Sequence, residues 1–295
     1  MLLRIGRARS TGKTGRDLPV SAGGPLNDEF MDPTPDGLAL SDSLTFEQPL
    51  HERVRLLLRL EALAQRFGDA LEGGRAFDHH EALVSLVDIY ALVTRVDIKR
   101  ELMGELERQT ANLDRLASRR EVDAERLTEI REDQRRLHAA LEAQAGALDH
   151  HVRGNEFFTS VRQRMTLPGG AFDFDLPIYH HWLAQPSVAR SALLQDWFAP
   201  LHSVAEATSQ VLTYLRQSGR GETIVAEDGF FERSLDTNRT WQLLRVSVDR
   251  NLGVYPEISA GRQRFTVRFF APGDFRSRPA PAAADIEFRL CCCAL

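Results

Sequence analysis

Arginine supplies nearly all of the positive charge in this chain, and its spacing predicts a recognition surface. Lysine occurs only at Lys13 and Lys99. The planar guanidinium group of arginine binds a carboxylate through two parallel hydrogen bonds, a geometry that lysine does not offer. In the alternating segment that begins at Arg264, the polar side carries Arg264 and Arg268 and no acid. This pattern predicts a basic strand face that suits an acidic peptide or a carboxylate ligand.

Three pairs of adjacent histidines raise the question of a metal site. Neighbouring residues on a helix point about 100° apart, so no such pair chelates an ion alone. The sequence contains no HExxH or CxxC spacing. We therefore predict neither a metal nor a cofactor. The pairs are His79-His80, His150-His151 and His180-His181.

The sequence also argues against an enzyme. Asp175 and His180 have the types of a general-base pair, but no GxSxG elbow or cysteine nucleophile accompanies them. The segment Gly6–Thr14 resembles a phosphate-binding loop, yet five residues separate its glycines where that loop needs four. We predict that the chain has no catalytic residues.

The three cysteines stand side by side at Cys291, Cys292 and Cys293. Adjacent cysteines cannot link distant parts of a fold, and their spacing does not suit zinc. Residues 292–295 formally fit a prenylation box, but no polybasic segment supports that interpretation. We therefore interpret them as an ordinary tail in a reducing cytoplasm.

Composition and charge exclude several classes of protein. The chain has 295 residues, of which 43% are hydrophobic and 27% charged, and a formal net charge of -5. The acidic balance argues against a general nucleic-acid binder, so any basic site must be local. No apolar run approaches the ~18 residues of a membrane span. The basic first residues have no apolar core after them, so we expect no secretory signal.

A corner at Val161–Trp182 joins the two halves of the predicted fold. Pro168-Gly169-Gly170 breaks the preceding helix. Phe172 and Phe174 then alternate with aspartates, which predicts a short, extended, half-buried segment. The corner also brings three basic residues together in the sequence beside a turn: Arg162, Arg164 and His180.

Helical periodicity dominates the chain before residue 221. A wide apolar stripe makes Leu50–Phe67 a helix that packs on more than one neighbour, and Arg59 lies on its other face. An apolar seam with steps near three and four predicts an antiparallel helical hairpin at about 98–152 that stands out from the body, with its connection at 119–122. Further helices are expected at 78–95, 178–183, 189–198 and 201–217.

From Glu222 the period changes to two, which predicts strands. We expect a hairpin around Gly229 and three half-buried strands of an antiparallel sheet that covers a core against the helices. The other faces of these strands would expose Arg245, Arg264, Arg268 and Arg289. The predicted class is α+β, with a disordered extension at 1–44, a mainly α-helical domain at 45–221 and a smaller β-strand domain at 222–295.

Six blocks of the sequence carry a resemblance to a known family. They are Phe46–Glu61, Arg100–Gln109, Val161–Leu183, Thr213–Gly219, Tyr255–Phe270 and Asp285–Cys292. These blocks resemble those of the ZapD family of cell-division proteins and run in the same order. The resemblance implies a cytoplasmic bacterial homodimer with a helical and a β-strand domain. It also implies that the dimer binds the C-terminal tail of the tubulin-like protein FtsZ and thereby bundles FtsZ filaments at the mid-cell division ring.

The resemblance also assigns partner-binding residues, because basic positions on both domains of the family hold the partner. The matching positions here are Arg59, Arg95, His180, Arg245, Arg264 and Arg268. Arg162 and Arg164 join them as basic residues of the corner. The alternative is a module that binds nucleic acid or another acidic ligand with the same arginines. The acidic net charge and the lack of aromatic residues between these arginines argue against nucleic acid.

Overall fold

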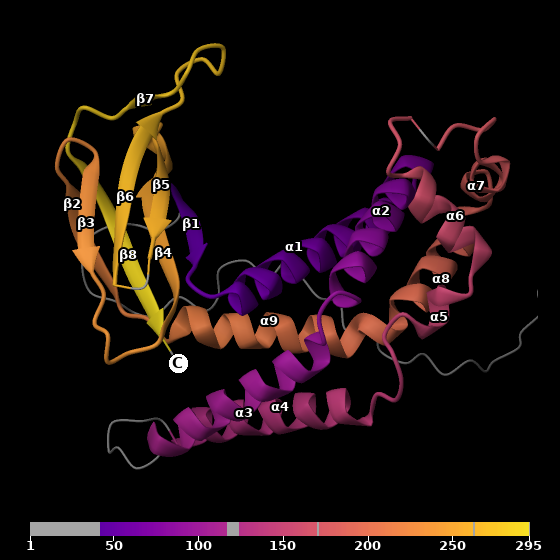
Figure 1. Cartoon of the computed structure of the whole chain (residues 1–295), viewed down its shortest axis with the longest axis horizontal. Coiled ribbons are helices and arrows are strands. Elements are labelled where there is room, and N and C mark those ends of the chain that lie inside the picture. The colour runs from indigo at the N-terminus through magenta and orange to yellow at the C-terminus, as the bar shows by residue number, and fades with distance from the viewer. Residues whose placement is uncertain (1–41, 117–123, 170, 262, 295) are drawn as a thin grey trace, which may run out of the picture. The chain divides into compact units, whose positions relative to one another are not determined.

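The computed structural model describes residues 42–116, 124–169, 171–261 and 263–294. Helices come first along the chain and most strands come last (Figure 1), which confirms the predicted α+β class. Most of the predicted extension 1–44 and the whole predicted connection 119–122 lie outside the described residues. The described part contains three strands that were not predicted: β1 (Ser43–Pro49), which precedes the first helix, β5 (Tyr255–Ala260) and the two-residue β7 (Ala280–Pro281).

The helices share one apolar core. The wide stripe of α1 packs on both α2 and α9, as its width predicts. Leu57 and Leu60 of α1 and Leu212 of α9 are fully buried in this core. The helices are α1 (Glu52–Gly73), α2 (Ala76–Val93), α3 (Ile98–Leu116), α4 (Ala124–Ala143), α5 (His150–Arg153), α6 (Glu156–Arg164), α7 (Pro177–Leu183), α8 (Ser187–Phe198) and α9 (His202–Gln217).

Helices α3 and α4 pack side by side, and both rest on α9 (Figure 1). Buried amides connect them: Gln134 donates to the Gln109 side chain at 3.1 Å, and Gln109 donates to the Val211 carbonyl at 3.2 Å. The prediction that the seam continues to residue 152 is wrong, because α4 ends at Ala143. Gln144 then leaves the helix, and its backbone carbonyl accepts a hydrogen bond from Lys99 at 2.6 Å.

The corner after α6 differs from its predicted form. Residues 171–175 form turns and bends, not an extended segment. The amides of Asp175 and Leu176 both donate to the Phe172 carbonyl and close the turn, and the side chains of Phe172 and Phe174 are exposed. The alternation of aromatic and acidic residues here therefore reflects a turn and not a strand.

The strands form two sheets, where one was predicted. Sheet A has the order β1-β4-β8-β2, and sheet B has the order β3-β6-β5, with β7 paired to β6. The inner faces of the sheets share a second core that includes Val246, Phe269 and Phe288. The strands are β2 (Gly221–Ala226), β3 (Phe230–Ser234), β4 (Trp241–Asp249), β5 (Tyr255–Ala260), β6 (Arg264–Ala271), β7 (Ala280–Pro281) and β8 (Ile286–Ala294).

The predicted hairpin around Gly229 is also wrong. The turn there connects β2 to β3, but β2 pairs with β8 in sheet A, whereas β3 pairs with β6 in sheet B. The chain thus crosses from one sheet to the other at this turn.

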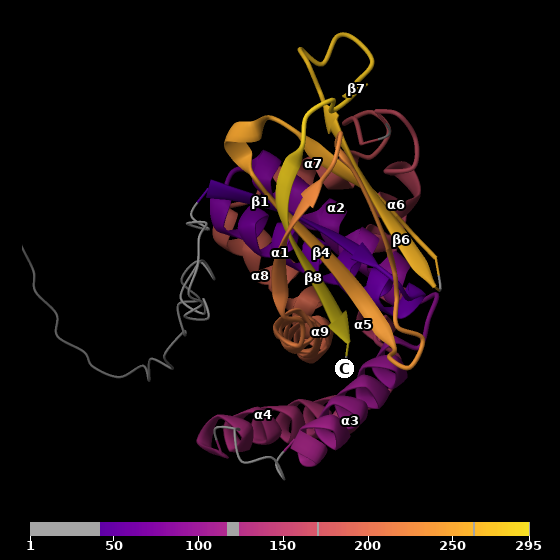
Figure 2. The same cartoon turned by 90° about the vertical axis from the view of Figure 1, so that its left-hand side faces the viewer.

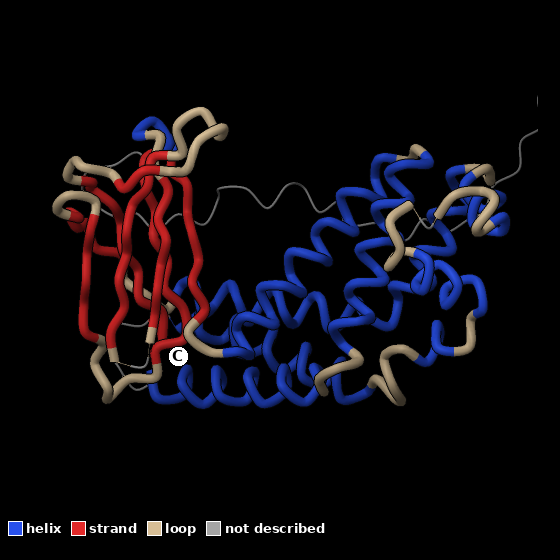
Figure 3. The backbone as a smooth tube through the Cα atoms, turned by 45° about the horizontal axis from the view of Figure 1, so that its top comes forward, coloured by secondary structure: helices blue, strands red, loops and turns tan. Residues whose placement is uncertain are grey.

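Among the described residues, the helices meet the strands mainly through sheet A. Helix α9 packs on β4 and β8, and Figure 2 shows it end-on beside the last residues of β8. Leu243, Cys291 and Cys293 on the outer face of sheet A belong to the helical core. Helices and strands otherwise occupy separate regions (Figure 3). The predicted core between the sheet and the helices is therefore limited to one end of sheet A.

Candidate partner-binding surfaces

The residues predicted to bind a partner are distributed over five places. Arg264 and Arg268 lie on β6, Arg245 on β4, Arg59 on α1 and Arg95 after α2. The corner holds the other three, namely Arg162, Arg164 and His180.

The outer face of sheet B combines cations with aromatic rings. In the register of β3 and β6, Phe230 lies opposite Arg268, and the Arg268 guanidinium carbon is 5.3 Å from the centre of the Phe230 ring. Tyr255 and Phe270 stack on the same face, with ring centres 5.9 Å apart. A guanidinium over an aromatic face is held in place without losing its hydrogen-bond donors. These side chains therefore place cationic and aromatic groups side by side on one exposed face, an arrangement that can contact both acidic and apolar groups of a ligand.

Acids on neighbouring strands partly neutralise this surface. Arg264 donates to Glu232 on β3 at 3.2 Å, and Glu257 on β5 lies opposite Arg268 in the register. Both partners of the Arg264–Glu232 pair are exposed to solvent. Such pairs contribute only ~0–1 kcal/mol, so a ligand carboxylate can compete for Arg264.

Arg245 lies on the outer face of sheet A, away from Arg264 and Arg268. It donates to Glu47 of β1 at 3.0 Å, and Glu47 also accepts two hydrogen bonds from Arg216 of α9. Arg216 further binds Glu61 of α1. Burial lowers the pKa of Arg216, but the hydrogen bonds to Glu61 and Glu47 outweigh it and raise that pKa above its usual value. Arg245 thus belongs to a network that connects β1, β4, α1 and α9.

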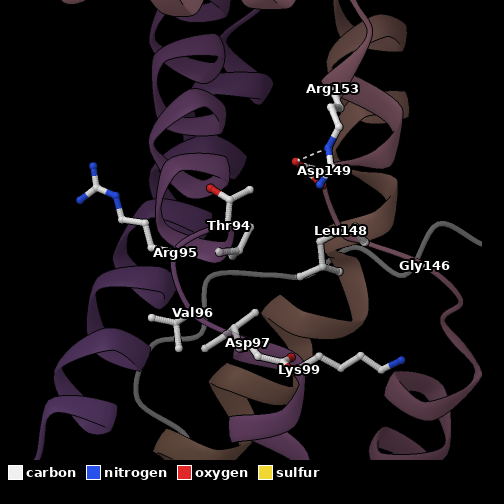
Figure 4. A pocket seen from close by; sticks show the side chains of 12 residues that line it. Thr94, Arg95, Val96, Asp97, Lys99, Gly146, Leu148, Asp149 and Arg153 are labelled. Atoms are coloured by element: carbon white, nitrogen blue, oxygen red, sulfur yellow. Dashed lines mark hydrogen bonds and ion pairs between the residues drawn. The ribbon is translucent and has the colours of Figure 1, made fainter.

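Arg59 and Arg95 are exposed, and neither side chain has an ion pair or hydrogen bond within the described residues. Arg95 lies beside a pocket of about 330 Å³ between the α2–α3 corner and the residues before α5. Its side chain extends away from the opposite wall, where Arg153 pairs with Asp149 at 2.8 Å (Figure 4). Arg95 therefore does not point into the pocket, whose lining also carries Lys99, Arg153, Asp97 and Asp149.

At the corner, the structure brings α6 and α7 together. Arg164 pairs with Asp175 at 3.4 Å. Arg162 and His180 are exposed, and in the described residues their side chains have no such partner. This corner therefore offers both free and paired basic groups.

The histidine pairs do not assemble into a metal site. Among the described residues, no group of three or more histidine, cysteine or acidic side chains could hold an ion. A pocket of about 500 Å³ is lined in part by His150, His151, Asp196 and His202. No helix in the described part of the chain is long and apolar enough to cross a membrane.

The aromatic members of the sheet B face were not predicted as site residues. They also show that the expected lack of aromatic residues among these arginines is wrong for Arg264 and Arg268, so that only the acidic net charge argues against nucleic acid. Phe270 lies two residues after Arg268 in β6, so the sequence alternation already places both side chains on the same face of the strand. Phe230 and Tyr255 reach this face only through their pairing with β6, which no local pattern gives.

Comparison with known proteins assigns the family. The family model described as "ZapD: Cell division protein" matches residues 58–268. The chain is 37% identical over 250 residues to the cell division protein ZapD of Janthinobacterium sp. strain Marseille, which covers 85% of this chain and 99% of that protein. It is 38% identical over 254 residues to the ZapD of Bordetella pertussis, covering 86% and 99% of the two chains. For the ZapD of Methylococcus capsulatus the identity is 35% over 256 residues, which cover 87% of this chain and 100% of that protein. The chain therefore belongs to the ZapD family of cell division proteins, and its role is in cell division.

Proposed function

We propose that this chain is a non-enzymatic cross-linker that binds the C-terminal tail of FtsZ. As a homodimer in the cytoplasm it would bundle FtsZ filaments at the mid-cell division ring. Membership of a cell-division family supports the proposal. The structural observation that carries it is the outer face of sheet B, where exposed guanidinium groups lie among aromatic rings.

The proposed contact uses two kinds of interaction. Arg264 and Arg268 donate charge-assisted hydrogen bonds to carboxylates of the tail. Phe230 is part of β3, which lies at the edge of sheet B, and its ring is partly exposed. Apolar residues of the tail pack against it, and an extended tail segment runs along this edge. The unpaired side chains of Arg59, Arg95, Arg162 and His180 are proposed as weaker, additional contacts, as are the paired Arg164 and Arg245.

Weak single contacts are sufficient for bundling. A filament presents many tails, so a particle with two tail sites gains from the high effective concentration of the second tail once the first is bound. The gain requires that the two sites reach different filaments at once.

The test is a titration with FtsZ tail peptide, together with sedimentation of polymerised FtsZ. We expect Arg264→Glu/Arg268→Glu to abolish peptide binding and filament bundling while the protein keeps its native mass and melting temperature. The matched control is Arg100→Glu/Arg135→Glu, which changes the net charge equally on two exposed positions of α3 and α4. This control should bind and bundle like the wild type.

Two outcomes would count against the proposal. Equal sedimentation with filaments that lack their tails would mean that the tail is not the ligand. Unchanged peptide binding by the doubly substituted protein would move the site away from sheet B.

A further inference from the structure

Two of the three consecutive cysteines lie against each other where the strands meet the helices. The cysteines were expected in a tail, but they belong to β8. Cys291 and Cys293 are two residues apart in this strand, so their side chains share the outer face of sheet A. Their sulfur atoms are 3.7 Å apart and are not joined by a disulfide, and both side chains are buried. Cys292 packs on the other side of the strand, against the core between the two sheets.

The end of α9 and the residues after it close over the two sulfur atoms. Cys293 Sγ donates to the backbone carbonyl of Arg216 at 3.8 Å. A Cβ atom on Gly219 would lie 2.5 Å from Cys291 Sγ and 2.9 Å from Cys293 Sγ, so the bare backbone of this glycine covers the pair. Such close cover leaves little room for oxygen atoms added to either sulfur. Loss of two hydrogens is the oxidation that requires no extra space.

The surroundings of Cys291 favour the thiolate, which is the reactive form of cysteine. A hydrogen bond from the Cys293 thiol and the charges of Arg245 and Arg289 lower the pKa of Cys291 from its ordinary value of 9.0 to about 7, although burial opposes them. The pKa of Cys293 is raised, because its thiol donates that hydrogen bond and is buried. Cys291 is 9% exposed and Cys293 is 0% exposed, so an oxidant in solution meets Cys291 first. This is the arrangement of an attacking cysteine beside a resolving cysteine.

The backbone of β8 allows a bridge between the two sulfur atoms but does not favour it. Residues two apart in a strand have Cα atoms about 6.6 Å apart, which is close to the upper end of the ~4.4–6.8 Å range of disulfides. At Cys291 the strand is paired with both β2 and β4. The pairing with β2 ends there, whereas the pairing with β4 continues to Cys293, beside a register shift between Trp241 and Leu243. The strand can therefore adjust at Cys293, and the strained bridge should be easily reduced again.

We propose that Cys291 and Cys293 form a reversible redox site, which hydrogen peroxide oxidises to a disulfide. The Cys291 thiolate attacks one oxygen of the peroxide, the O–O bond breaks, and the departing hydroxide takes up a proton to become water. The sulfur of Cys293 then attacks the sulfenic acid on Cys291. The S–S bond forms as the S–O bond breaks, and the Cys293 proton leaves with the hydroxide as a second water. Two thiols are thus oxidised while one peroxide is reduced, and this chemistry does not depend on the proposed function.

The bridge would loosen the contact between α9 and sheet A. Both thiols belong to the helical core in the reduced protein. To form the bond, the sulfur atoms must approach from 3.7 Å to about 2.05 Å, which draws Cys293 away from the Arg216 carbonyl. The side chain of Arg216 binds Glu47 and Glu61, so the same residue connects the strands to the helices. We expect the melting temperature of the oxidised protein to fall by a few degrees.

A map of the free thiols in the folded full chain tests the proposal. The protein is treated with hydrogen peroxide, the remaining thiols are alkylated, and the C-terminal peptide is sequenced by tandem mass spectrometry. We expect Cys292 to be alkylated, and Cys291 and Cys293 to be bridged, with the loss of two hydrogens. Dithiothreitol should restore all three thiols and the original melting temperature.

Two variants separate the roles of the cysteines. Cys293→Ala should stop at the sulfenic acid on Cys291, which dimedone traps. The matched control is Cys292→Ala, which removes a thiol from the same strand and should form the bridge at the wild-type rate. The wild-type map decides the question even if a variant fails to fold. Three free thiols after treatment, a bridge to Cys292, or a bridge between two chains would overturn the proposed site, and an unchanged melting temperature of the bridged protein would refute the loosened contact.

Discussion

The Arg190 guanidinium group donates from Nε to Nδ1 of His79 at 2.8 Å, and both side chains are buried. Because the guanidinium group of Arg190 can only donate hydrogen bonds, Nδ1 must be the unprotonated nitrogen of the imidazole ring. Nε2 then carries the hydrogen and donates to Ser191 Oγ at 3.1 Å. Three further hydrogen bonds run from Arg190 to backbone carbonyls, among them that of Gly74 at 3.0 Å. The contact thus joins α2, α8 and the α1–α2 corner, and it requires a neutral His79.

This contact predicts a loss of stability in mild acid. Burial and the adjacent Arg190 charge lower the pKa of His79 below its ordinary value of 6.5. Above that value His79 is neutral in both the folded and the unfolded chain, and its contribution is constant. Below that pH, His79 takes up a proton in the unfolded chain but stays neutral in the folded chain. The free energy of unfolding therefore falls by up to ~1.4 kcal/mol per pH unit. Urea unfolding between about pH 8 and pH 5 measures this.

His79→Gln is the control for that prediction, because its side-chain oxygen still accepts from Arg190 but does not titrate. The difference in stability between the wild type and this variant should shrink as the pH falls below 6.5. A difference that is independent of pH would show that His79 does not titrate in this way.

Among the arginines that form ion pairs near the protein surface, Arg216 is expected to cause the largest loss of folding stability when it is replaced. It donates four hydrogen bonds of 2.6–3.0 Å to Glu47 and Glu61, and all three side chains are mostly buried. Arg216→Met should lower the free energy of unfolding by about 2–4 kcal/mol, because it leaves two carboxylates with incomplete partners. Arg136 provides the comparison: it pairs with Glu206 of α9 at 2.8 Å, but both are about half exposed. Arg136→Met should cost no more than ~1 kcal/mol. Equal losses in urea unfolding would contradict this difference.

The sequence predicts those parts of the fold whose signal is local. The apolar stripe of Leu50–Phe67 and the alternation in Leu244, Val246 and Val248 identify a helix and a strand without any knowledge of their neighbours. Strand β1 was missed although Leu44 and Phe46 alternate with polar residues, because the run is short and adjoins a segment rich in Gly and Pro. Its identity as a strand depends on pairing with β4, which is remote in the sequence.

For the candidate site, too, the sequence predicts only what depends on a local pattern. That Arg245, Arg264 and Arg268 lie on the polar sides of strands follows from alternation alone. That Arg245 faces away from the other two follows from the division of the strands into two sheets, which local patterns do not encode. The pairing of Arg245 with Glu47 could not be predicted either, because Glu47 belongs to strand β1, which was missed.

Substitution by alanine should lower the folding stability at Gly219 and raise it at Gly104. A Cβ atom on Gly219, after α9, would lie 2.5 Å from Cys291 Sγ and 2.8 Å from the Cys292 carbonyl oxygen. Gly219→Ala should therefore force α9 and β8 apart and lower the free energy of unfolding by about 1–3 kcal/mol. Gly104 lies within α3, and a Cβ atom there would meet nothing within 4 Å. Gly104→Ala should raise stability by ~0.5–1 kcal/mol. Thermal melts of the two variants give the comparison, and a stabilised Gly219→Ala would refute the close approach.

If sheet B binds the tail through charge, bundling must weaken with salt. The Debye length falls from ~10 Å at 0.1 M to ~3 Å at 1 M ionic strength. Sedimentation of FtsZ filaments with the wild type should therefore decrease steeply over this range. The mass of the protein alone, measured at the same salt concentrations, separates a loss of tail binding from a loss of dimer. Bundling that does not respond to salt would argue for a contact dominated by the apolar residues of the face.

Removal of one acid from sheet B should strengthen tail binding. Glu232 accepts from Arg264 at 3.2 Å, so in the proposed binding mode it would compete with the tail for that guanidinium group. Glu232→Gln removes the competing charge, and we expect the affinity for tail peptide to rise about two- to fivefold, the scale of one exposed ion pair. The matched control is Glu287→Gln, because Glu287 is an exposed acid on β8 of sheet A and its replacement changes the net charge equally. If both variants gain the same affinity, the tail responds to the total charge of the protein and not to Arg264. A gain confined to Glu232→Gln, and lost again when Arg264→Gln is added, would locate the tail carboxylate at Arg264.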